Sequence, residues 1–177
     1  MTSEEIFTSA MNHMVEGIMI HEELSNYYLF LGLPAYSKCH EKHFHKENKS
    51  YKKLYNYYIK TYNKLIPNIR VDVPEVIPKS WYQYNRQDVD MKTKQNAVQQ
   101  GLEKWVKWET ATFTLYQSLY QELIKIGKVR DAIEFKHLIC DVKEELETAT
   151  QYHLNKLSTN FDMVYIIEEQ NNMDKTI

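Results

Sequence analysis

The sequence is poor in residues that break helices and in residues that form disulfide frameworks. Of its 177 residues, only four are glycine, four are proline and two are cysteine. Cys39 and Cys140 lie far apart and have no CxxC spacing, so we expect them to be unpaired structural thiols in a reducing cytoplasm. Because glycine and proline are scarce, their positions indicate where regular elements end.

Several signals of function are also missing. No apolar run is long enough to cross a bilayer, and residues 1–10 lack the basic and apolar regions of a signal peptide, so we expect a cytoplasmic protein with no membrane partner. The formal net charge of −2 gives no overall electrostatic argument for nucleic acid. Without a Gly-rich phosphate loop, a GxSxG motif or a Cys/His zinc spacing, hydrolase, kinase and dehydrogenase functions have no support.

What the sequence does contain is helical periodicity. Thr2 and Glu5 have the spacing of a capping box, and apolar residues then recur at intervals of three and four. Asp131 and Glu134 have the same capping-box spacing and predict the start of another helix. The predicted helices span residues 3–31, 35–66, 91–126 and 131–157, with a short fifth helix over residues 161–170.

The connections between these helices predict the topology. Short connections within the first pair and within the second pair favour two antiparallel hairpins. Residues 67–90 contain three prolines and no helical period. A 30-residue helix is about 45 Å long, and a connection of this length, at about 3.3 Å per residue, is long enough to run along it. We therefore predict an all-α four-helix bundle in one domain over residues 1–177, with a long crossover between the hairpins and a short C-terminal helix.

Acidic residues interrupt the apolar stripes of the four long helices. Those in phase with the stripes are Glu22, Glu47, Glu109 and Glu145, and Asp141 lies beside the last of them. No lysine or arginine shares these faces. Buried carboxylates lose hydration and repel one another, and a bound metal ion would offset both costs. Carboxylates with histidine are the ligands of di-iron and di-manganese sites in helical bundles, so we expect iron or manganese here.

Histidine and lysine residues of the second helix add to this interpretation. His43 lies one turn before Glu47, so the two side chains are placed to share a metal ion. Alternatively, the inward carboxylates are protonated or hydrogen-bonded to some of the 14 tyrosines. A lysine stripe roughly opposite Glu47 is explained by a solvated face, the alternative being a surface for anions or nucleic acid. It consists of Lys38, Lys42, Lys46, Lys49, Lys53, Lys60 and Lys64.

Short segments of every helix resemble the ferritin-like superfamily. HEELSNYY, which contains Glu22 and Ser25, is similar to the first-helix ligand segment of non-haem ferritins. KWETATFTLYQ places Glu109 at the third-helix ligand position, and FKHLICDVKEELE places Asp141 and Glu145 near those of the fourth. NKLSTNFDMVYIIEEQ is similar to the closing turn and short fifth helix of bacterial ferritins. The resemblance implies a homo-oligomer that binds metal ions and oxidises ferrous iron.

The second-helix segment departs from the family pattern. In ENKSYKKLYNYY, Glu47 matches the family glutamate, but Ser50 stands where the pattern Glu-x-x-His has histidine. Either His43 or His40 replaces that ligand from an earlier turn, or the site is degenerate. In the second case the chain is a non-catalytic bundle that acts through a surface, in a structural role or by binding protein or nucleic acid.

Overall fold

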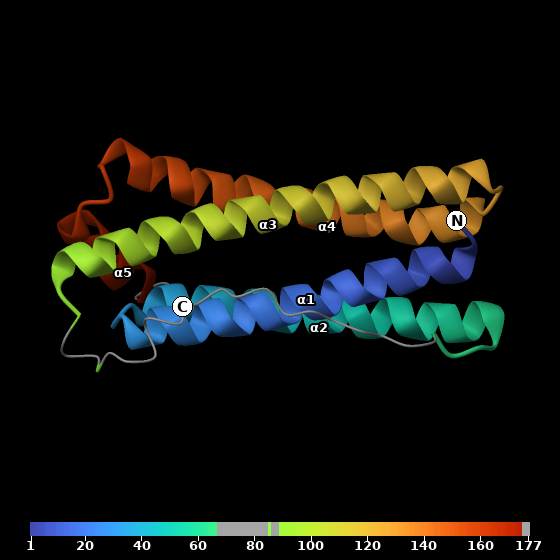
Figure 1. Cartoon of the computed structure of the whole chain (residues 1–177), viewed down its shortest axis with the longest axis horizontal. Coiled ribbons are helices and arrows are strands. Elements are labelled where there is room, and N and C mark those ends of the chain that lie inside the picture. Colours follow the sequence, from blue (N-terminus) through green and yellow to red (C-terminus); the bar gives the residue numbers. More distant parts are fainter. Residues whose placement is uncertain (67–84, 86–88, 175–177) are drawn as a thin grey trace.

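The computed structural model describes residues 1–66, 85 and 89–174, and nearly all of these residues lie in helices (Figure 1). The helices are α1 (Ser3–Phe30), α2 (Pro34–Tyr62), α3 (Met91–Lys125), α4 (Val129–Ser158) and α5 (Met163–Asp174). No strand occurs in these ranges. The predicted fold class, an all-α four-helix bundle with a short C-terminal helix, is therefore confirmed.

Helices α1 and α2 pack together as one antiparallel hairpin, and α3 and α4 form the other. The capping box predicted at Thr2 begins α1, since the Thr2 hydroxyl accepts from the Glu5 amide and the Glu5 carboxylate accepts from the Thr2 amide. Gly127 follows α3 with a φ of 74°, a conformation that favours glycine. Cys39 and Cys140 are both free thiols, as predicted.

Helix α4 begins two residues before the predicted start. Lys128 precedes it and makes no side-chain capping hydrogen bond. Asp131 lies inside the first turn, is only 3% exposed, and accepts hydrogen bonds from the hydroxyls of Tyr57, at 2.8 Å, and Tyr62. The predicted capping box at Asp131 is therefore wrong, because this carboxylate connects α4 to α2 instead.

Helix α2 ends at Tyr62, before the predicted residue 66, because Asn63 turns the chain in the left-handed conformation with a φ of 51°. Figure 1 shows that α2 ends at one end of the bundle and that α3 begins at the other. The predicted crossover, residues 67–90, lies outside the described residues except for Asn85, Val89 and Asp90.

The apolar core is divided into two clusters along the bundle. One surrounds Phe7, Tyr58 and Phe135 near the N-terminus, and the other surrounds Tyr28 and Leu102 near α5. A layer of buried polar side chains lies between them, and its charged or ionisable members are His21, His40, Glu47, Glu109 and Glu145. None of the described helices is long and apolar enough to cross a membrane.

Candidate metal centre

Three of the four predicted inward carboxylates meet in the polar layer. Glu47 comes from α2, Glu109 from α3 and Glu145 from α4, and each is at most 6% exposed. They interact electrostatically with one another and with the hydroxyl of Tyr116. Their burial follows from the apolar stripes of these three helices, with which each glutamate is in phase.

Helix α1 contributes an imidazole to this layer instead of a carboxylate. Glu22 is exposed, so its predicted place on the interior face is wrong, whereas the neighbouring His21 is fully buried. One turn earlier, Gly17 faces α2, and a Cβ atom there would lie 3.1 Å from Glu47 Oε1. The α1 position opposite Glu47 therefore has no side chain at all.

Glu109 is the most deeply buried carboxylate of the layer. Its Oε1 accepts a hydrogen bond from the Trp105 indole at 3.0 Å and lies 3.4 Å from His21 Nε2. Its Oε2 has no hydrogen-bond partner among the described residues. A buried carboxylate oxygen without a partner costs free energy, and its lone pairs remain able to accept a hydrogen bond or to bind an ion.

His21 and His40 form a buried imidazole pair in which the two Nδ1 atoms are 3.1 Å apart. Burial holds the pKa of His40 well below its ordinary value, and His21 and His43 lower it further, so His40 is neutral. One Nδ1 atom of the pair donates to the other, and the direction depends on the tautomers of the two rings. In the arrangement in which His21 Nδ1 donates to His40, His21 Nε2 is unprotonated and its lone pair faces Glu109.

Glu145 lies between two cationic side chains. Lys46 Nζ is 2.6 Å from its Oε1, and His43 Nδ1 is 3.7 Å from its Oε2. Burial opposes protonation of His43, but Cys39 and Glu145 raise the pKa of this imidazole to about 10. Burial likewise raises the pKa of Glu145, but His43 and Lys46 lower it below the usual range. Glu145 is therefore an anion paired with an imidazolium and an ammonium.

Glu47 has a different charge state from Glu145. Burial, followed by the charges of Glu145 and Glu109, raises its pKa well above the ordinary value, although His43 and Lys46 act in the opposite direction. The neutral, protonated form of Glu47 is therefore favoured. Glu145, by contrast, is held as an anion by the two cations beside it, Lys46 and His43.

A narrow hollow leads to the layer between α2 and α4. Its volume is about 10 Å³, which is room for a single water molecule. Glu47 and Glu145 line its inner part, and the exposed Asp141, a predicted ligand, lies at its rim. Ser50, at the position where the family pattern has histidine, also lines it.

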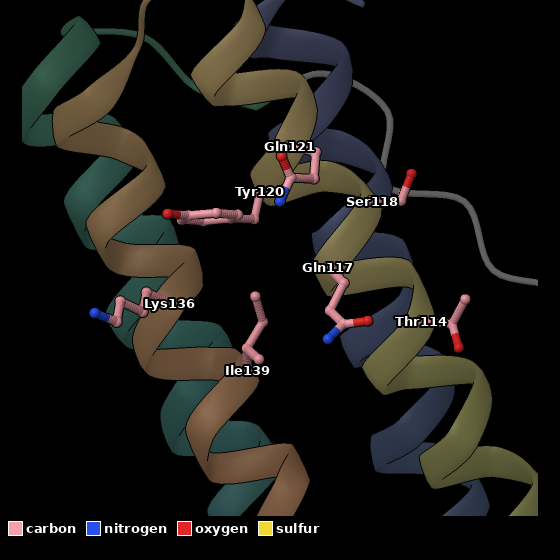
Figure 2. Close-up of a pocket in the computed structure, with 7 residues that line it drawn as sticks. All are labelled: Thr114, Gln117, Ser118, Tyr120, Gln121, Lys136 and Ile139. Carbon is pink, nitrogen blue, oxygen red and sulfur yellow. The ribbon is translucent and has the colours of Figure 1, made fainter.

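A larger hollow, of about 560 Å³, lies on the outer face of α3 and α4 (Figure 2). Its lining contains no carboxylate and no imidazole, so it lacks the side chains that usually bind iron or manganese. The residues around it are Thr114, Gln117, Ser118, Tyr120, Gln121, Lys136 and Ile139.

The donor atoms of the layer suit a transition-metal ion, although the site is not assembled. Within residues 1–66, 85 and 89–174, no three His, Cys, Asp or Glu side chains lie close enough together to hold a metal ion. Nevertheless, His21 Nε2, His43 Nδ1 and Glu109 Oε2 are buried without hydrogen-bond partners. His21 and Glu109 already approach within 3.4 Å, a separation at which two donors about 2.1 Å from one ion are found.

Comparison with known proteins supports the fold independently. No protein-family model and no curated protein sequence matches the chain. Among solved structures, it is similar to an open-pore ferritin from the hyperthermophilic archaeon Archaeoglobus fulgidus, with a TM-score of 0.79, 10% identity, and coverage of 98% of this chain and 97% of that one. A humanized archaeal ferritin gives a TM-score of 0.76, 10% identity, and coverage of 96% and 93%.

A bacterioferritin from Rhodobacter capsulatus, solved with a metal-free dinuclear site and heme iron, is similar as well. Its TM-score is 0.69 at 15% identity, over 86% of this chain and 84% of that one. The chain therefore has the fold of the ferritin-like superfamily, which confirms at the level of fold the resemblance seen in the sequence.

Proposed function

We propose that this chain is a ferritin-fold metal protein that binds one iron or manganese ion in the polar layer of its bundle. The observation that carries the proposal is the buried Glu109 carboxylate, whose Oε2 has no hydrogen-bond partner and whose Oε1 lies 3.4 Å from His21. A carboxylate oxygen buried without a partner costs stability. A cation held by Glu109 and His21 would remove that cost.

The neighbouring side chains have distinct tasks in this proposal. Glu47 and Glu145 are the further carboxylate ligands. His43, one turn before Glu47 on α2, becomes a nitrogen ligand when the incoming ion displaces the proton that the imidazole holds beside Glu145. Trp105 orients Glu109 through its indole N–H. When bound, ferrous iron would supply the electrons for the reduction of oxygen or peroxide, which is the ferroxidase reaction that ferritins suggest.

Gly17 and Ser50 explain why we propose one ion rather than two. Gly17 provides no ligand opposite Glu47, and Ser50 replaces the histidine of the family pattern. We further propose a cytoplasmic homo-oligomer. Exposed apolar side chains support association between copies of the chain, among them Ile133, 50% exposed, and Val164, 62% exposed.

The test compares two neighbouring residues of α1. Wild type, His21→Gln and Glu22→Gln are loaded with ferrous iron without oxygen, desalted and analysed for metal content. We expect about one iron per chain in wild type and in Glu22→Gln, because Glu22 is exposed, and almost none in His21→Gln, because His21 is buried beside Glu109. Loss of iron in Glu22→Gln alone would contradict the proposed ligands, and absence of iron from wild type would contradict the function.

The two cations beside Glu145 favour a second candidate, a non-catalytic bundle that acts through its surface. In that case the ion pairs that Glu145 makes with His43 and Lys46 are permanent. The lysine stripe of α2 would then be the surface to test, because Lys42 and Lys49 are exposed. Binding of DNA at low salt that is lost in Lys42→Gln/Lys49→Gln would support this candidate, and wild-type iron binding without DNA binding would exclude it.

A further inference from the structure

Lys46 differs from the other lysines on its helix. Its neighbours Lys42 and Lys49 are exposed, whereas Lys46 turns inward and places Nζ 2.6 Å from Glu145 Oε1. A contact this short is a charge-assisted hydrogen bond. The Glu145 side chain is only 7% exposed, so the ammonium group is its main compensation for lost hydration.

Lys46 also occupies the entrance of the layer. It lines the narrow hollow together with Glu47 and Asp141, on the side where α2 and α4 face solvent. Its own side chain remains 42% exposed, so its flexible stem can move the ammonium outward without disturbing the helix. An ammonium group that moves outward stays near two acidic side chains of α4, because Asp141 and Glu144 interact favourably with its charge.

We infer that Lys46 is a removable internal cation, which holds Glu145 in the metal-free chain and gives this carboxylate up to an incoming divalent ion. The inference rests on the proposed function and names the residue that regulates the same site. The Glu145 carboxylate cannot pair fully with the Lys46 ammonium and a metal ion at the same time. Metal binding therefore requires the ammonium to move away, toward Asp141 and Glu144. Lys46 therefore lowers metal affinity and compensates the charge of Glu145 until an ion binds.

The size of this effect follows from the hydrogen bond that has to break. A hydrogen bond to a charged group contributes enough free energy to change an equilibrium constant by roughly ten- to a hundredfold. Lys46→Gln should therefore bind a divalent ion about ten- to a hundredfold more tightly than wild type. Lys46→Arg keeps the charge and should remain close to wild type, and Lys49→Gln, which removes an exposed charge from the same helix, is the matched control.

The experiment titrates the four proteins with Mn²⁺ alone and measures the free ion by its electron paramagnetic resonance signal. Thermal unfolding in EDTA and in excess Mn²⁺ provides the second readout and shows that each variant folds. In EDTA we expect Lys46→Gln to melt below wild type, because Glu145 loses its partner. In Mn²⁺ we expect it to gain more in melting temperature than wild type, a reversal that loss of a merely structural ion pair does not produce.

The outcomes separate this inference from the proposed function. If wild type and Lys46→Gln bind Mn²⁺ equally, the role of Lys46 is overturned and metal binding stands. If Lys46→Gln binds and wild type does not, competition by Lys46 is supported, whereas the proposed function of the natural chain fails. If neither protein binds Mn²⁺, both proposals are overturned.

Discussion

Replacing Glu109 by glutamine should change stability and metal binding in opposite directions. The side chain is 0% exposed, one oxygen accepts from Trp105, and the other has no partner. Glutamine keeps an acceptor for the indole N–H and removes the buried negative charge. Without metal, the variant no longer has the cost of burying a carboxylate oxygen without a partner, so its free energy of unfolding should rise. With metal, the proposed site lacks one of its ligands, so the affinity for the ion should fall.

The hydrogen-bond partners of Glu109 determine how much Glu109→Gln should change the free energy of unfolding. Burying a carboxylate oxygen without a partner costs more than about 1–3 kcal/mol, whereas the amide NH2 of glutamine, left without a partner in the same place, costs about 1–3 kcal/mol. We therefore expect Glu109→Gln to raise the free energy of unfolding by about 1 kcal/mol. For a chain of this size each kcal/mol moves the melting temperature by about 2–4 °C, so the increase should be about 2–4 °C.

The assay is thermal unfolding in EDTA and in Mn²⁺, with two comparison variants. Glu109→Ala removes the acceptor for Trp105 and leaves a cavity, so it should lower the free energy of unfolding by about 2–4 kcal/mol. Glu103 is an exposed glutamate of the same helix, so Glu103→Gln should change neither the melting temperature in EDTA nor the increase that Mn²⁺ produces. The reasoning is refuted if Glu109→Gln is destabilised as much as Glu109→Ala, or if Mn²⁺ still stabilises it as it does wild type.

Two further predictions concern the ion pair of α2 and the buried aspartate of α4. The pKa of His43 is about 10 when folded, against an ordinary value of 6.5, so its contribution is fully present below pH 6.5 and is lost as the pH rises toward 10. Urea unfolding between pH 6.5 and 9 should show a decline in stability that His43→Gln flattens, and a flat wild-type profile would rule this out. Asp131→Ala should lower the free energy of unfolding by about 3 kcal/mol, because two tyrosine hydroxyls lose their acceptor, with Tyr57→Phe about half as damaging. A loss below 1 kcal/mol in Asp131→Ala, measured by the same unfolding, would disprove that account.

The interior faces of three helices could be predicted because their apolar stripes have one clear phase. Glu47, Glu109 and Glu145 follow large apolar or aromatic residues at intervals of three and four, and all three are buried. Their role as metal ligands stays a prediction. The inward turn of Lys46 could not be predicted in this way, because a long, flexible side chain is directed by the charge it meets and not by helical phase alone.

The phase of α1 was harder to predict because this helix has apolar residues on several sides. Glu22 is in phase with Leu29, seven residues further on, and this spacing is why we predicted that Glu22 faces the interior; Leu29, however, is 52% exposed. The observed stripe instead continues from Met14 through Gly17 to His21. Gly17 has no apolar side chain to mark the interior face of α1. The apolar pattern in the sequence therefore stops indicating the buried face one turn before His21.

The division of the core into two apolar clusters explains how the fold and the site can vary separately. The clusters around Phe7 and around Tyr28 hold the helices together on either side of the polar layer. The packing that holds the helices therefore lies outside the layer, and a position such as Gly17, which presents no side chain to Glu47, does not disturb the fold. Three carboxylates buried between these clusters lose hydration and add little apolar packing. This cost in stability is the argument for the chemical role that we propose for them.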